Sequence, residues 1–210
     1  MLACANITGV IKKKEETVEK IKKAAVSEFL DKGYAKASLR TICRQAGVTT
    51  GAMYFSFESK EALFRAILEP LIEEYEKLLE MYMGMELSDS EQGAELDVRM
   101  MKFILTHRKE TVLIMEKAGG SCFEDYRAHV EQLMEQSFRT YYKSRTGTAP
   151  GEALIRILAK MRLEGCLEII KGNYDMEYSL YLAEKIGIYA GGGTEKLIQD
   201  LLKEVHGNSL

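Results

Sequence analysis

The chain has 210 residues, a length that is enough to bury a hydrophobic core without the help of disulfide bonds. Its four cysteines form no CxxC pair, and no apolar run approaches the roughly 20 residues of a membrane-spanning helix. These features argue against a disulfide or zinc scaffold and against a membrane protein. Scattered thiols of this kind predict a cytoplasmic protein.

The net charge of -3 hides an asymmetry along the chain. Residues 1–65 contain 12 Lys and Arg against 7 Asp and Glu, whereas residues 66–210 contain 17 against 25. A basic N-terminal segment on an acidic body is typical of a chain with an N-terminal nucleic-acid-binding module. Ordinary solvated surface charge explains the same pattern equally well.

The composition predicts an all-α fold, because prolines are few and alternating β-branched runs are rare. The first helix is expected over Glu15–Lys32, with Gly33 as its C-terminal stop. Its apolar positions recur at spacings of three and four residues and predict one buried face. They are Val18, Ile21, Ala25 and Phe29.

Two short helices are predicted next, joined by a tight turn. Ser38 is a suitable N-cap for a helix that ends near Gln45, and Thr49 caps a third helix over Thr50–Phe55. The intervening Ala46-Gly47-Val48 has the composition of a turn. Three helices connected in this way predict a helix-turn-helix unit.

The rest of the chain is predicted to be helical as well. A fourth helix is expected from Ser59, with Pro70 removing one backbone hydrogen bond and kinking or splitting it, and Gly84–Gln92 is expected to be a loop. Glycine, proline and polar breaks separate the later helices. Those are predicted over Glu91–Thr106, Arg108–Ala118, Cys122–Tyr142, Gly151–Lys171, Asp175–Ala190 and Thr194–Val205.

One stretch, from Ile21 to Phe64, carries a dense set of spaced small, aromatic and capping residues. They are Ala24, Ala25, Phe29, Gly33, Tyr34, Ser38, Leu39, Ile42, Ala46–Thr49, Gly51, Tyr54, Phe57, Ser59–Glu61, Leu63 and Phe64. This stretch resembles the DNA-binding domain of the tetracycline-repressor (TetR) family almost position by position. The resemblance implies a three-helix DNA-binding domain over residues 1–58 and a larger helical domain for ligand binding and dimerisation over residues 59–210.

The resemblance also implies a function and a set of DNA contacts. The expected protein is a transcriptional regulator, a repressor that a small molecule releases from a palindromic operator, with no cofactor and no metal. Base readout is expected from Thr50, Gly51 and Ala52, because a threonine or alanine methyl can touch a thymine methyl. Phosphate contacts are expected from Ser38, Thr49, Tyr54 and Lys60. Arg40 and Phe55 complete the predicted DNA-binding set.

Each predicted phosphate contact has an alternative explanation. Ser38 and Thr49 can serve only as helix caps, Tyr54 can pack, and Lys60 can be a solvated cation. The sequence also departs from the usual family pattern, since Phe55 stands where a polar or basic residue is common. Arg40, Arg44 and the run Lys12-Lys13-Lys14 are candidates to compensate.

Two other classes of protein compete with a regulator. An enzyme is disfavoured because the three histidines His107, His129 and His206 form no HExxH or Glu-x-x-His site. The glycine-rich segment from Gly187 to Gly193 lacks the ending of a phosphate-binding loop and is interpreted as a helix break. A scaffold that has lost its groove contacts would bind DNA weakly and without steep salt dependence.

A homodimer is predicted through the helices near 151–171 and 175–190. The first of these is apolar on more than one side, so a partner is expected to cover the surplus; the alternative is a fully buried central helix. Its apolar residues are Leu154, Ile155, Ile157, Leu158, Met161, Leu163, Leu167, Ile169 and Ile170. The second carries a similar stripe at Tyr178, Tyr181, Leu182, Ile186 and Tyr189.

A pocket for a hydrophobic effector is predicted in the C-terminal body, because methionine and aromatic side chains suit an adaptable apolar site. The alternative is that they simply fill the core. The candidate lining residues are Met100, Phe103, Met115, Phe123, Tyr126, Met134, Phe138 and Met161. The helix that begins at Ser59 is expected to couple this pocket to the DNA-binding unit.

Overall fold

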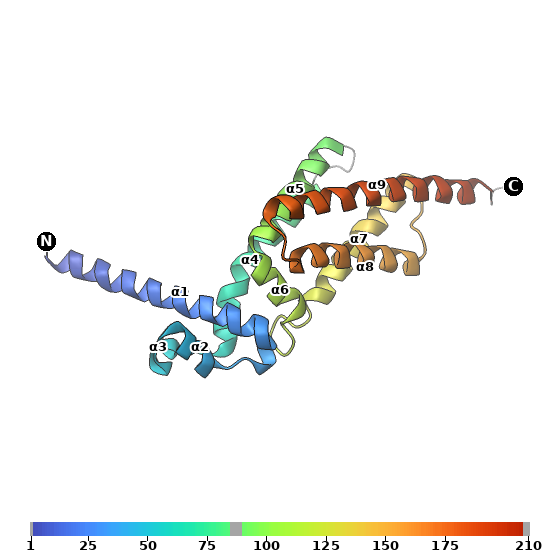
Figure 1. Ribbon diagram of the computed structural model, residues 1–210. Helices are drawn as coiled ribbons and strands as arrows, with labels where there is room; N and C mark the ends of the chain where they lie inside the picture. Colours follow the sequence, from blue (N-terminus) through green and yellow to red (C-terminus); the bar gives the residue numbers. More distant parts are fainter. Residues whose placement is uncertain (1, 85–89, 208–210) are drawn as a thin grey trace. The chain divides into compact units, whose positions relative to one another are not determined.

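The computed structural model describes residues 2–84 and 90–207, with side chains described over 12–79 and 98–204. The described residues form nine helices and no strand, so the predicted all-α fold is confirmed (Figure 1). No described helix is long and apolar enough to cross a membrane. In chain order the helices are α1 (Leu2–Lys36), α2 (Leu39–Ala46), α3 (Thr50–Ser56), α4 (Lys60–Gly84), α5 (Ser90–Thr106), α6 (Arg108–Glu116), α7 (Tyr126–Thr146), α8 (Glu152–Lys171) and α9 (Met176–Gly207).

The helices pack into two compact units. The first contains residues 1–77 and 109–125, and the second contains residues 78–108 and 126–210. Packing therefore places α6 and the turns that follow it with the N-terminal helices, an arrangement that the sequence did not suggest. The boundary after residue 58 remains a prediction about the division of function.

Helix α1 is longer than the predicted Glu15–Lys32, since it begins at Leu2. Its regular geometry breaks at Gly33, where φ is 72° and ψ is 160°, before a last turn that reaches Lys36. The expected stop at Gly33 is thus a sharp kink. Only glycine adopts this backbone conformation readily, because it has no Cβ.

An aromatic cluster organises the core of the first unit. The Phe29 and Phe64 rings meet edge to face at 4.9 Å between centroids, and the Tyr34 ring lies 4.8 Å from that of Phe64. Aromatic pairs with this spacing add to the stabilisation from burial. The same core contains the fully buried Ile21, Ala25, Ile42, Met53, Leu63 and Leu68.

Helix α4 is continuous through Pro70, so the predicted split does not occur. Ser59 caps its first turn, since the Ala62 N–H donates to the Ser59 hydroxyl at 3.0 Å. The expected loop over Gly84–Gln92 is in part correct, because α4 ends at Gly84 and α5 begins at Ser90. Residues 85–89 lie outside the described part of the chain.

The helix predicted over Cys122–Tyr142 begins later than expected, because α7 starts at Tyr126. The preceding residues form turns that the Ser121 side chain holds: its hydroxyl accepts the Phe123 N–H at 3.1 Å and donates to the Ala118 carbonyl at 2.7 Å. Side-chain bonds to nearby backbone compete with helix formation in this way.

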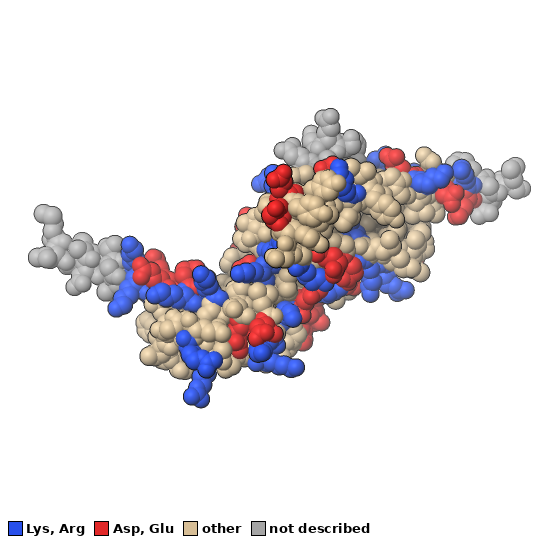
Figure 2. Space-filling model, viewed as in Figure 1, with Lys and Arg blue, Asp and Glu red and all other residues tan. Residues whose placement is uncertain are grey.

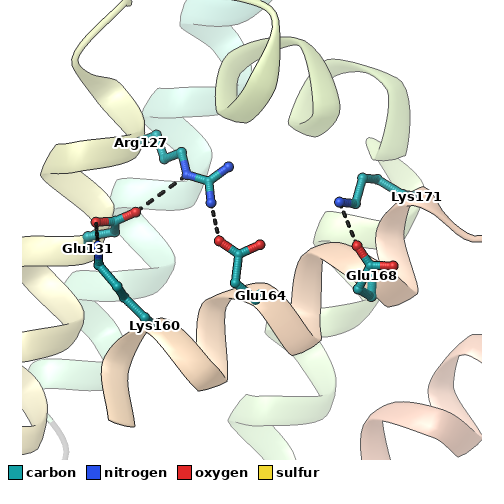
Figure 3. A network of polar contacts seen from close by, with 6 residues as sticks. All are labelled: Arg127, Glu131, Lys160, Glu164, Glu168 and Lys171. Carbon is teal, nitrogen blue, oxygen red and sulfur yellow. Dashed lines mark hydrogen bonds and ion pairs between the residues drawn. The ribbon is translucent and has the colours of Figure 1, made fainter. Parts of the chain in front are cut away.

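In the second unit α7 packs on α8, and charged side chains link their exposed sides (Figure 3). Arg127 pairs with Glu131 on its own helix and with Glu164 on α8, while Lys160 lies 3.8 Å from Glu131. Partly exposed pairs of this kind contribute little individually, on the order of 0–1 kcal/mol. The apolar side chains that α7 and α8 bury, such as Val130 and Leu163, are therefore expected to contribute more to stability than these ion pairs.

Helix α9 is one unbroken helix, so the predicted break at Gly187–Gly193 and the separate helix over Thr194–Val205 are wrong. Asp175 caps its start by accepting the Tyr178 N–H at 2.8 Å. Glycine costs about 1 kcal/mol relative to alanine inside a helix but does not forbid it. The apolar and helix-favouring residues on both sides outweigh this cost.

Candidate nucleic-acid interface

The segment from Ser38 to Phe57 forms a helix-turn-helix in which each helix has an N-cap and a C-cap residue. The Ser38 hydroxyl accepts the Thr41 N–H at 3.4 Å, and the Thr49 hydroxyl accepts the Ala52 N–H at 3.1 Å. Gly47 ends α2 in the left-handed conformation with φ of 67°. The turn between α2 and α3 therefore takes three residues, 47–49, and the caps define where α2 ends and α3 begins.

Helix α3 buries one side and exposes the other. Met53 is fully buried, and Phe57 closes the same core. Thr50 and Gly51 are exposed and Ala52 is half-buried. Tyr54 and Phe55 are exposed by 51% and 77%. A short helix with small residues in its first turn and two aromatic rings beyond them presents a surface that fits a DNA major groove.

The Ser38 and Thr49 side chains act as caps, which was the alternative to phosphate contact. A hydroxyl that accepts one hydrogen bond still has its own proton to donate. Capping and phosphate contact are therefore compatible, and the phosphate contacts remain predictions. Tyr54 does not pack in the core, so its hydroxyl lies at the surface.

The Lys60 side chain has a structural position that the sequence did not reveal. Its ammonium group donates to the carbonyl oxygens of Tyr34, Ala35 and Ala37 at 2.7, 3.2 and 3.4 Å. It also lies 4.5 Å from the centre of the Tyr34 ring. Lys60 thus satisfies the carbonyl groups at the end of α1, where a cation is favoured. Its phosphate contact stays a prediction.

Basic side chains lie near the exposed side of α3, on α1 and α2. Arg40 and Arg44 are exposed and lie one turn apart on α2. Figure 2 shows Lys and Arg side chains projecting around α2 and α3 and along α1, with Asp and Glu interspersed on α1. Such a distribution attracts a polyanion without defining which bases it carries.

Glu28 is a residue that sequence reasoning missed. It is 6% exposed, and one carboxylate oxygen accepts the Ser38 N–H at 3.1 Å. This bond connects the C-terminal third of α1 to the start of α2. The helix pattern contains a signal for this position, because Glu28 follows Ile21 by seven residues and Ala24 by four and so falls on the buried face of α1.

A second carboxylate, Glu61, connects α4 to two other elements. It accepts the Tyr34 hydroxyl with one oxygen and the Cys122 N–H with the other, the latter at 2.9 Å. Hydrogen bonds from Cys122 and Tyr34 lower the pKa of Glu61 below its ordinary value. Partial desolvation and the Glu61 carboxylate raise the pKa of Cys122 to about 11. The turns after α6 are therefore connected to α4 and to the end of α1 within the first unit.

The predicted pocket residues divide between the two units. Met115 is buried and Phe123 half-buried in the first unit. The second unit contains five half-buried candidates and one surface residue, Met161, which is 59% exposed on α8. The others are Met100 and Phe103 on α5 with Tyr126, Met134 and Phe138 on α7, all half-buried. The pocket itself remains a prediction.

Within the described part of the chain, no group of three or more His, Cys, Asp or Glu side chains is arranged to hold a metal ion. The rings of His107 and Phe103 are tilted against each other with centroids 4.8 Å apart, and the His129 and Tyr126 rings are 6.1 Å apart. Both histidines are thus accommodated by neighbouring rings. His206 lies outside the side chains that the structure describes.

Comparison with known proteins identifies the family. Residues 21–67 match the bacterial regulatory proteins of the tetR family. The HTH-type transcriptional regulator TtgR of Pseudomonas putida is 30% identical over 154 residues, which cover 66% of this chain and 70% of TtgR. The chain belongs to the TetR family. It is therefore a DNA-binding regulator of transcription and not an enzyme.

Other relatives of this TetR-family chain agree with that assignment. The regulator YvdT of Bacillus subtilis is 31% identical over 125 residues, and the match spans 59% of this chain and 60% of YvdT. Solved structures show the same fold: a transcriptional regulator from Aquifex aeolicus aligns with a TM-score of 0.54 at 20% identity, over 82% of this chain and 99% of its own. A TetR-like regulator from Rhodococcus aligns with a TM-score of 0.56 at 18% identity, over 85% and 96%.

Proposed function

We propose that this TetR-family protein is a repressor that binds a palindromic operator as a homodimer and leaves it when a small apolar molecule binds. The exposed side of α3 is the observation that supports DNA binding. Helix α3 follows the turn at Gly47 and is capped by Thr49. Its first turn presents the small residues Thr50, Gly51 and Ala52, which allow the backbone to approach base edges closely.

The residues of the interface divide into two roles. Thr50, Gly51 and Ala52 lie in the first turn of α3 and are proposed to contact base edges. Ser38, Thr49, Tyr54 and Lys60 are proposed to contact phosphates, which fix orientation but carry no sequence information directly. Arg40 is a further candidate for such a contact.

The surface of α8 and α9 supports a dimer between two copies of this chain. Ile155 and Leu167 are buried, yet Ile157 and Met161, four positions apart on one face of α8, are exposed by 54% and 59%. Apolar side chains of α9 are exposed too, with Tyr189 at 78%. A C2 dimer covers such a face with the same face of its partner.

The release step requires an effector that binds the DNA-incompetent state more tightly than the competent one. The half-buried methionine and aromatic side chains of α5 and α7 favour an apolar molecule. Helix α4 contributes residues to both units, which supports it as the coupling element.

Two conservative variants test the division of roles at the interface. Tyr54→Phe removes one hydroxyl donor but keeps the ring, so binding is expected to weaken on every DNA sequence alike. Thr50→Val removes a hydroxyl while keeping the shape, so the order of preferred sequences is expected to change. A Tyr54→Phe protein with altered base preference and unchanged overall affinity would contradict the assignment.

The ligand step is tested by a thermal-shift screen of apolar compounds, followed by operator binding with and without each hit. A hit is expected to stabilise the protein and to weaken operator binding. If compounds bind and stabilise but operator affinity does not change, the protein does not work by ligand release.

A further inference from the structure

The N-terminal part of α1 extends beyond the region that defines the family. Helix α1 begins at Leu2, whereas the family match begins at residue 21. Within this extension Lys14 reaches α3: its ammonium nitrogen lies 5.2 Å from the centre of the Phe55 ring. The extension and the proposed recognition helix therefore meet at one pair of side chains.

The position of Lys14 on the helix explains how the contact forms. Val18 and Ile21 follow Lys14 at spacings of four and three residues, so the three side chains share one face. Ile21 is fully buried in the core of the first unit and Val18 is half-buried. Lys14 therefore lies on the same face of α1 as these two residues, but beyond the end of the core. At this position its side chain contacts the Phe55 ring.

The contact is too weak to be explained by stability alone. A cation over an exposed aromatic ring gains about 0.5–1 kcal/mol, whereas a lysine side chain loses up to about 2 kcal/mol of rotamer entropy when it is fixed. The Phe55 ring is exposed by 77%, although aromatic rings of soluble proteins are usually buried to a large extent. The face of an aromatic ring attracts a lysine ammonium group through the ring's quadrupole. The ammonium group has three N–H donors and can still donate a hydrogen bond to an oxygen acceptor.

We propose that Lys14 and Phe55 form one composite DNA contact, in which the ring enters the major groove and the ammonium group binds a backbone phosphate beside it. This inference rests on the proposal that α3 enters the groove. A phenylalanine ring can make apolar contact with a thymine methyl group, and phosphates border the groove on both sides. The α1 extension is thereby a phosphate-binding element in addition to the helix-turn-helix.

The test measures DNA affinity against salt concentration for the full-length protein. The probes are a duplex carrying the sequence that the wild-type protein selects from a random pool and mixed-sequence duplex DNA. Lys14→Ala is expected to weaken binding to both probes roughly tenfold at low salt. It is also expected to reduce the slope of log affinity against log salt by about one.

Lys23 provides a matched control, because it is exposed on the same helix and lies nine positions, or half a turn, away from the face of Lys14. Lys23→Ala removes the same charge and is expected to leave the slope unchanged. Lys14→Arg keeps both charge and ring contact and is expected to restore binding. In a Phe55→Leu protein, Lys14→Ala is expected to weaken DNA binding by a smaller factor than it does in the wild-type protein, because the two residues act as a pair.

The outcomes separate this inference from the proposed function. If the wild-type protein binds DNA with steep salt dependence but Lys14→Ala behaves as Lys23→Ala does, the composite contact is wrong and the proposed function stands. If Lys14→Ala lowers the unfolding temperature but not DNA affinity, the contact is structural only. If the wild-type protein binds no DNA, the proposed function fails and this inference fails with it.

Discussion

Gly33 is the single residue on which the junction between α1 and α2 depends most. Its φ of 72° and ψ of 160° fall in a region that side chains with a Cβ rarely adopt. The next residue is fixed there, since the Tyr34 N–H donates to the Lys117 carbonyl at 2.9 Å. Gly33→Ala is therefore expected to lower the free energy of unfolding by about 1–3 kcal/mol.

Chemical denaturation of Gly33→Ala measures this change. Gly47→Ala, at the left-handed end of α2, is a comparison in which an added Cβ meets no atom within 4 Å, so the destabilisation expected there comes from the positive φ alone. If Gly33→Ala unfolds at the same denaturant concentration as the wild-type protein, the backbone at this junction is not constrained as described.

Cys122 is expected to react slowly with alkylating reagents although its side chain is exposed. Its pKa is raised to about 11, so the fraction of thiolate, the reactive form, is very small at pH 8 and grows as the pH rises toward that value. Iodoacetamide labelling followed by mass spectrometry of the Cys122 peptide measures this pH dependence.

Glu61→Gln removes the negative charge that opposes thiolate formation at Cys122. Labelling at pH 8 is expected to become faster in this variant, because the pKa of Cys122 falls toward its ordinary value. Fast labelling of the wild-type protein at pH 8 would show that the contact between Glu61 and Cys122 is not maintained.

At the level of elements, α9 shows how local and long-range effects compete. The sequence predicts a break at the glycines near residue 190, because glycine lowers helix propensity. The helix continues because the residues before and after these glycines include many with high helix propensity, such as Leu, Glu and Lys. Gly192 is exposed and an added Cβ there would meet nothing, so Gly192→Ala is expected to stabilise the protein by about 1 kcal/mol.

Thermal unfolding of Gly192→Ala is the corresponding measurement. The expected result is a higher midpoint with unchanged secondary structure. A lower midpoint would mean that the glycine is needed for a close contact, such as one with a second copy of the chain.

The helix-turn-helix was predictable from the sequence because its signals are local. Caps at Ser38 and Thr49, the turn at Gly47 and the buried Met53 each depend on residues within a few positions. The capping of α1 by Lys60 and the bonds of Glu61 were not predictable, since they join positions more than 20 residues apart. The start of α7 was misplaced for a similar reason, because Ser121 favours turns over a helical residue at Cys122.

For the whole molecule, the proposed dimer follows from the exposed apolar face of α8. Ile157→Glu places a charge in the centre of that face and is expected to shift the protein from dimer to monomer, whereas Ile157→Val should leave the dimer intact. Sedimentation at micromolar concentration distinguishes these states. A wild-type protein that sediments as a monomer would contradict the proposed interface.

Selection of bound sequences from a random duplex pool tests the central claim, that two copies of α3 read a symmetric operator, most directly. The expected result is an inverted repeat whose half-sites are centred about one helical turn apart, roughly 34–36 Å, to match the symmetry of a dimer. Enrichment of a single site without its inverted copy, or no enrichment at all, would contradict the claim.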